Sequence, residues 1–264
     1  DCRGHPIFDD ADPCHASTDR TLVVHCWLAV KECSLLLGSL VTSLPLPADP
    51  ASALLTEEQV QQIGRIFIHV LLHTKHKGAI AKAQDGFGQV ARRLLRCGLP
   101  TLQALPGQWL DLLLSEAGVL NTSYARILRR SAGLPFAVLP LLDAEDRFSP
   151  QPLLRRCMQE LLAVAGEGEE EGAEAAHEFS RVNALNVMKY VVEDAQLSLD
   201  VQPYLGRALL LCLRGFEHSS WTIRNSSMML YSALVLKGVG SQQQKRKGGM
   251  SVPEFLNRFP QVAP

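Results

Sequence analysis

The sequence has almost no net charge and no closely spaced cysteine pair, and both absences exclude classes of protein. It holds 26 basic and 27 acidic side chains, so its formal net charge is −1. There is no overall field to attract nucleic acid or an anionic membrane, and such binding must come from local clusters. The 7 cysteines include no C-x-x-C pair, which argues against a disulfide framework or a zinc site. We expect a reduced, cytoplasmic chain.

Strand patterns and common catalytic motifs are also missing from the sequence. No alternation of apolar and polar residues indicates a strand, and neither a P-loop nor a Gly-x-Ser-x-Gly turn occurs. A Gly-x-Gly-x-x-Ala string begins at Gly86, but helical sequence precedes it, so we interpret it as a helix kink or a join. The longest apolar run that we identify, residues 134–142, is too short to span a bilayer, and we predict no membrane span.

Three histidines, His69, His73 and His76, have a spacing that could suggest a metal site. The first two share a helix face, as in zinc proteases, but Val70 stands where those enzymes carry a glutamate. We therefore predict that the chain binds no metal. Because the catalytic and cofactor motifs above are missing too, we predict that it binds no cofactor and is not itself an enzyme.

What the sequence does contain is a series of helical patterns separated by proline and glycine. Long patterns cover residues 21–43, 56–73, 79–97, 179–194, 201–214 and 220–236, and shorter ones cover 106–116, 123–130, 134–142 and 150–165. Consecutive pairs recur at about 40 residues in the second half, near the period of HEAT and armadillo repeats. The sequence predicts an all-α fold, a segment of a HEAT/armadillo-like helical-repeat solenoid.

Composition divides the chain into one helical domain with irregular additions. We expect an irregular segment over residues 1–20 and a single helical-repeat domain over 21–264. Within it, residues 166–176 predict a mobile acidic loop, and residues 238–249 a loop with the basic run Lys245 to Lys247. Because the chain starts at Asp1, we expect it to be a piece of a longer protein.

The segment 218–234 is the most informative helical pattern. Small hydroxyl residues suit a helix N-cap, and an apolar stripe follows them. The stripe consists of Trp221, Met228, Tyr231 and Leu234. Arg224 and Asn225 lie one turn inside, as in the second, buried helix of a HEAT-type repeat. We expect Arg224 to pair with a carboxylate of a neighbouring repeat.

Basic residues form the strongest candidate binding site. Arg129 and Arg130 lie near the end of a predicted helix and are followed by a turn with Ser131, Gly133 and Pro135. One interpretation is that the two cations offset the negative end of the helix dipole. The other is contact with phosphate, which the planar donors of arginine suit well.

Six motifs in collinear order, from about residue 20 to 260, resemble one known family. They are Trp27-x3-Lys31-Glu32-x-Ser34-x-Leu36-Leu37-Gly38, His76-Lys77-Gly78-Ala79 with Gly86-Phe87, Arg129-Arg130-Ser131-Ala132-Gly133-Leu134-Pro135, Asn183-Ala184-Leu185-Asn186, Trp221-x-Ile223-Arg224-Asn225-Ser226, and Phe255-x2-Arg258-Phe259-Pro260. Together they resemble the central conserved region of the thyroid adenoma-associated protein family.

The resemblance implies a function that composition alone does not indicate. Family members are large helical-repeat proteins that partner a small FtsJ-like methyltransferase, which methylates the ribose 2′-oxygen of nucleotide 32 in the tRNA anticodon loop. The large subunit positions the tRNA, and the small one binds S-adenosylmethionine. The implied RNA- or partner-binding residues here are Arg129, Arg130, Ser131, Gly133, Pro135, His76 and Lys77, with Trp221, Arg224 and Asn225 as structural repeat residues.

Two features depart from the family pattern and leave an alternative open. The chain has a fraction of the family's length, and its acidic insert at 166–176 is peculiar to this sequence. A protein-interaction scaffold without an RNA role, such as a calcium-pump partner at the endoplasmic reticulum, would use the same kind of surface. Binding of RNA with a steep salt dependence would separate the two functions.

Overall fold

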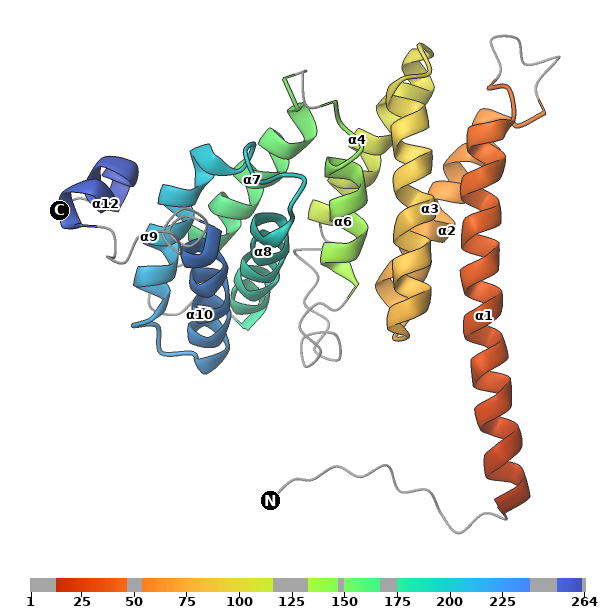
Figure 1. Cartoon of the computed structure of the whole chain (residues 1–264), viewed down its shortest axis with the longest axis horizontal. Helices are drawn as coiled ribbons and strands as arrows, with labels where there is room; N and C mark the ends of the chain where they lie inside the picture. Colours follow the sequence, from red (N-terminus) through yellow and green to blue (C-terminus); the bar gives the residue numbers. More distant parts are fainter. Residues whose placement is uncertain are drawn as a thin grey trace.

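The computed structural model of the chain describes residues 13–46, 54–115, 133–146, 150–166, 175–237 and 251–262. Every regular element in these ranges is helical (Figure 1), which confirms the predicted all-α class. The helices are α1 Pro13–Ser43, α2 Glu57–His73, α3 Lys77–Leu95, α4 Pro100–Leu114, α6 Leu134–Leu142, α7 Pro152–Gly166, α8 Ala175–Glu193, α9 Leu205–Gly215, α10 Trp221–Val235 and α12 Val252–Arg258, with 3-10 turns at Gln202–Tyr204 and Pro260–Val262.

Local sequence signals account for most helix ends. Thr56 and Gln59 form a capping box at the start of α2, in which each side chain accepts a hydrogen bond from the other residue's backbone N–H. Gly98, with φ of 74°, takes the chain out of α3, and Pro100 begins α4. The starts of α1, α4 and α8 were predicted too late, since these helices begin at Pro13, Pro100 and Ala175.

The helices pack in two rows. Helices α1, α3, α6, α8 and α10 form the first row, in which each packs on the one before, and α2, α4, α7 and α9 form the second. Figure 1 shows α2 and α4 behind α1, α3 and α6. This is the arrangement of a helical-repeat stack, with the core between the rows. The second-row helices begin at residues 57, 100, 152 and 205, a wider spacing than the predicted 40 residues.

Glycines allow α1 and α3 to approach closely. A Cβ atom on Gly38 would lie 2.9 Å from the Cα of Gly86, and one on Gly86 would lie 2.5 Å from the carbonyl oxygen of Ser34. Helix α3 continues without a break through Gly86 and Gly88. The interpretation of the Gly-x-Gly string as a kink or join was therefore wrong, because these glycines serve helix packing.

The predicted apolar stripe of α10 does not face the core. Trp221, Met228 and Tyr231 are 66%, 60% and 36% exposed, and within the stripe only Leu234 is buried. The buried face instead carries Ile223, Ser226, Ser227, Leu230, Ala233 and Leu234. At Ser227 the side chain must be small because α9 lies close: a Cβ on Gly215 would lie 2.1 Å from the hydroxyl of Ser227.

Helix α1 contains a segment that is long and apolar enough to cross a membrane, although no such segment was predicted from the sequence. By length and composition alone, Thr21–Ser43 is apolar enough to do so, and the same test is met by core helices of soluble proteins. Ser34, Gly38 and Val41 are buried, which ties the second half of α1 to the stack. The predicted helix at 123–130 and most of the predicted loops at 166–176 and 238–249 lie outside the described residues.

Candidate functional site

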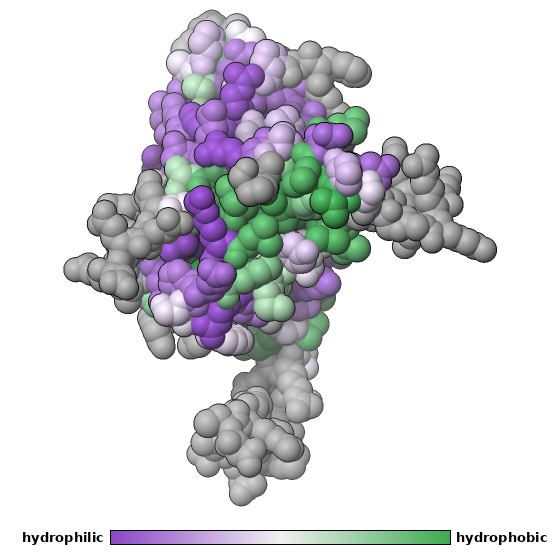
Figure 2. All heavy atoms as spheres, turned by 90° about the vertical axis from the view of Figure 1, so that its left-hand side faces the viewer, coloured by the Kyte–Doolittle hydropathy of each residue, from purple (hydrophilic) through white to green (hydrophobic). Residues whose placement is uncertain are grey.

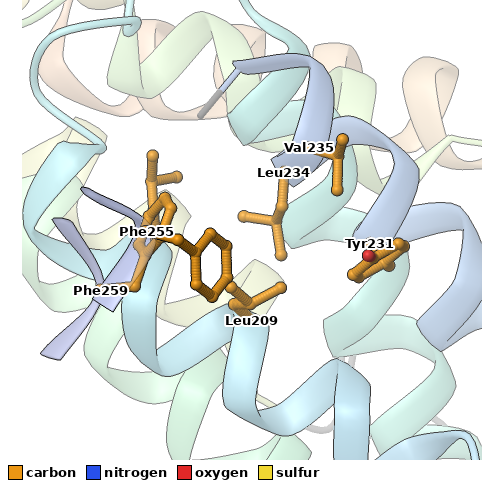
Figure 3. A pocket seen from close by; sticks show the side chains of 7 residues that line it. Leu209, Tyr231, Leu234, Val235, Phe255 and Phe259 are labelled. Carbon is orange, nitrogen blue, oxygen red and sulfur yellow. The ribbon is translucent and has the colours of Figure 1, made fainter. Parts of the chain in front are cut away.

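Two pockets in the described part of the chain have largely apolar linings. Figure 2 shows apolar side chains gathered on the end of the stack near the C-terminus, where α9, α10 and α12 meet. A cavity of about 30 Å³ lies there, with Phe255 and Phe259 on one side and Tyr231 on the other (Figure 3). A groove of about 210 Å³ between α1 and α2 is lined by apolar side chains and the hydroxyl of Ser34. Such linings suit packing rather than acid–base chemistry.

Cysteine and metal chemistry finds little support in the described part of the chain. Within it, no group of three His, Cys, Asp or Glu side chains could hold a metal ion. The described cysteines are free, at positions 26, 33, 97, 157 and 212. Burial raises the pKa of the Cys157 and Cys212 thiols to about 12, so neither forms a reactive thiolate near neutral pH.

The most distinctive arrangement of aromatic and cationic side chains lies at the connection between α2 and α3. The Trp27 ring from α1 stacks on the His76 ring, with centroids 4.1 Å apart and planes 14° apart. Lys75 and Lys77 flank His76 in the sequence, and both are exposed. We call these four residues the Trp27–His76 cluster. It combines an aromatic stack with two exposed positive charges.

His76 has a structural role within this cluster. Its Nδ1 accepts a hydrogen bond of 3.2 Å from the backbone N–H of Ala79, which makes His76 the N-cap of α3. Because this bond fixes the imidazole ring, it also fixes the surface on which Trp27 stacks. The sequence predicted a contact role for His76, and this capping role had not been anticipated.

The other two histidines of the predicted trio form a separate pair. His69 and His73 stack with ring centroids 4.2 Å apart. The Nδ1 of His73 lies 2.8 Å from the carbonyl oxygen of His69, a hydrogen bond along α2. This nitrogen is therefore directed at the backbone rather than at a shared metal position.

Gly133 brings the start of α6 against the last turn of α2, next to the connection between α2 and α3. A Cβ atom on Gly133 would lie 2.0 Å from the carbonyl oxygen of Leu71 and 2.8 Å from the Cα of Leu72, so no side chain fits there. Leu71 and Leu72 belong to the last turn of α2, directly before the connection that carries Lys75 and His76. Pro135 is buried in the first turn of α6. Arg129, Arg130 and Ser131 lie outside the described residues.

Arg224 does not pair with a carboxylate as predicted. Its Nη1 donates to the carbonyl oxygens of His218 and Ser219, at 2.8 and 2.7 Å, and so secures the connection between α9 and α10. Asn225 is half-buried beside it. A bridge between repeats occurs instead in the second row, where Arg156 of α7 lies 3.1 Å from the Asp111 carboxylate of α4.

Glu178 is a polar residue that sequence reasoning missed. Its carboxylate accepts hydrogen bonds from the hydroxyls of Ser220 and Thr222 at the start of α10. Burial raises the pKa of Glu178, but these hydroxyls, followed by the charges of His218 and Arg181, outweigh burial and lower it overall. Ser220 is the N-cap residue of α10 as the sequence suggested, yet its hydroxyl bonds to Glu178 rather than to the helix backbone.

A family model and several curated proteins match most of the chain. The family model described as THADA/TRM732, DUF2428 matches residues 9–222. The chain is 35% identical over 254 residues to the tRNA (32-2′-O)-methyltransferase regulator THADA of Gallus gallus, which covers 94% of this chain. It is 30% identical to the regulator of the same name from Drosophila melanogaster, and 27% identical to the regulator trm732 of Schizosaccharomyces pombe.

These relatives are much longer than the chain. The matched region is 13% of the Gallus gallus protein and 16% of the Schizosaccharomyces pombe protein. No solved structure matches the chain.

Proposed function

The chain belongs to the THADA/TRM732, DUF2428 family, and from this membership we propose that it is a non-catalytic, tRNA-binding segment of a methyltransferase regulator. The observation that carries the proposal is its similarity, over 94% of its length, to proteins named tRNA (32-2′-O)-methyltransferase regulators. In this proposal a separate FtsJ-like enzyme in the cytoplasm binds S-adenosylmethionine and transfers the methyl group. This chain binds and orients the tRNA.

Orientation alone can account for a large effect of such a subunit. Holding a ribose 2′-hydroxyl beside the methyl donor converts an encounter into a nearly intramolecular reaction, and this can contribute about 7–11 kcal/mol to lowering a barrier. A two-row helical stack suits that role, because each helix is fixed by its neighbours along and across the rows.

The cationic residues near α2 and α6 support a phosphate-binding surface. Arg129 and Arg130 precede Gly133 closely in the sequence, and Gly133 is held against the last turn of α2. Lys75 and Lys77 follow that turn and are exposed. We therefore propose that both pairs of cations contact the tRNA backbone, as structured RNA is usually recognised.

Replacement of Arg129 and Arg130 by alanine tests this assignment. We expect the double variant to bind tRNA more weakly, to show a shallower dependence of log Kd on log salt, and to fail to support ribose methylation at nucleotide 32 in cells that lack the endogenous regulator. The matched control is Arg92→Ala with Arg93→Ala, two exposed arginines in the last turn of α3, at the end away from His76.

Thermal unfolding separates binding from packing. The proposal expects the Arg129/Arg130 variant to keep the melting temperature of the wild type. If stability and methylation fall together, the two arginines support packing and the assignment is wrong. If the wild-type chain binds the enzyme but shows no salt-dependent tRNA binding, the chain is a protein-interaction scaffold and the tRNA role is wrong.

A further inference from the structure

Trp27 has an environment unlike that of a core tryptophan. It is one of three tryptophans; Trp109 is 3% exposed, whereas Trp27 keeps 36% of its surface exposed although one ring face is stacked on His76. Trp27 lies in the part of α1 in which residues 21–29 are all exposed. Its ring is therefore an accessible aromatic surface and not part of the hydrophobic core.

The ring is also held in place from behind. The N-cap hydrogen bond from Ala79 fixes the imidazole of His76, against which Trp27 lies. The close approach of Gly38 and Gly86 fixes α1 on α3. A ligand that stacks on Trp27 would thus meet a surface that has already lost its rotational freedom, which favours binding.

Charge beside the ring indicates the kind of ligand. Lys75 and Lys77 are exposed on either side of His76 in the sequence, and both are donors that suit phosphate. An aromatic face next to mobile cations is the combination that proteins use for unpaired nucleotides, in which the base stacks and the phosphate meets the cation. A peptide or lipid ligand would not need a flat, rigid stack of rings.

We propose that Trp27 is a stacking platform for the base of an unpaired RNA nucleotide, whose flanking phosphates contact Lys75 and Lys77. The inference rests on the proposed tRNA-binding function and makes it more specific, because it assigns this surface to a single-stranded part of the RNA. In this proposal, one face of the Trp27 ring packs on His76 and the ring also contacts the base of the nucleotide.

Fluorescence quenching provides the test. In a Trp221→Phe chain, Trp27 is the accessible indole, since Trp109 is buried and Trp221 is exposed on α10. We expect a short single-stranded oligoadenylate to quench this emission, and inorganic polyphosphate of equal charge to leave it unchanged, because only the first can stack. Equal responses to both probes, or a response to neither, would overturn the proposal.

Affinity measurements give a second, independent result. Loss of the base stack should make Trp27→Ala bind oligoadenylate about 5- to 150-fold more weakly than wild type, while Trp27→Phe retains part of the affinity. The double variant Lys75→Ala with Lys77→Ala should bind oligoadenylate and polyphosphate more weakly, and to a similar extent. Salt-dependent binding of whole tRNA without quenching would disprove the stacking platform and leave the proposed function intact. Quenching by oligoadenylate without binding of tRNA would disprove the proposed function instead.

Discussion

Replacing Gly86 by alanine tests the packing that holds α1 on the stack. A methyl group at this position would lie 2.5 Å from the Ser34 carbonyl oxygen and 3.0 Å from ring carbons of Phe67. Since ordinary contacts begin at 3.4 Å, α1 would have to move away from α3 by roughly 1 Å. The Ser34 atom belongs to the backbone of α1, so a change of side-chain rotamer cannot relieve the clash.

Two opposing effects set the size of the change. Overpacking of this kind costs about 1–3 kcal/mol, whereas alanine in a helix interior is favoured over glycine by about 1 kcal/mol. We therefore expect Gly86→Ala to lower the free energy of unfolding by up to about 2 kcal/mol. The same movement of α1 would draw Trp27 away from His76 and reduce quenching by oligoadenylate.

Gly107→Ala is the matched control. Gly107 also lies inside a helix, α4, but the nearest atoms to its Cβ would be Arg156 Nη2 at 3.4 Å and Leu153 Cδ2 at 3.7 Å. Because no clash has to be relieved, the higher helix propensity of alanine should raise the free energy of unfolding of this variant by about 0.5–1 kcal/mol. Urea denaturation followed by circular dichroism measures the free energy of unfolding of both variants. A Gly86→Ala chain as stable as Gly107→Ala would refute the account of α1–α3 packing.

Two further residues give predictions about stability and its pH dependence, both measurable by urea denaturation. The buried Glu145 carboxylate accepts the backbone N–H groups of Leu153 and Leu154 at 2.8 and 2.9 Å, so Glu145→Ala should cost about 2 kcal/mol and Glu145→Gln about half as much. Burial raises the pKa of Glu145 above 4.5. The free energy of unfolding of wild type should therefore exceed that of Glu145→Gln by most below pH 4.5. This difference should decrease as the pH rises through the folded-state pKa. Burial and the charge of Arg181 lower the pKa of His218 below 6.5, so wild-type stability should fall as the pH drops from 6.5 through the folded-state pKa, and His218→Asn should remove this fall.

Much of the fold follows from signals that act within a few residues. The capping box of Thr56 and Gln59 and the stop at Gly98 are local events, and the structure has helix ends at both. The family could also be identified from the sequence, because it depends on the order of short motifs. For the candidate site, the resemblance is what singled out His76 and Lys77 along with Arg129 and Arg130; the close approach of Gly133 to Leu71 is a property of the packed chain.

The role of individual side chains was harder to predict for a physical reason. Trp27 carried no sign that it would stack on His76, since one ring lies on α1 and the other in the connection before α3, and they meet only when α1 packs on α3. His76 resembled a ligand-binding residue, yet its ring caps a helix. Arg224 suggested an ion pair with another repeat, whereas the nearest acceptors proved to be carbonyl groups of the preceding connection.

The amino-acid sequence by itself determined the helical class, most helix ends and the family, because periodicity, capping and motif order are written along the chain. Tertiary structure decided which face of each helix is buried. In α10 the serines at 226 and 227 turn inward and Trp221 and Met228 turn outward, and at Ser227 the close approach of Gly215 leaves room only for a small side chain. Hydropathy reports how apolar a stripe is, but the spacing between neighbouring helices determines what that stripe contacts.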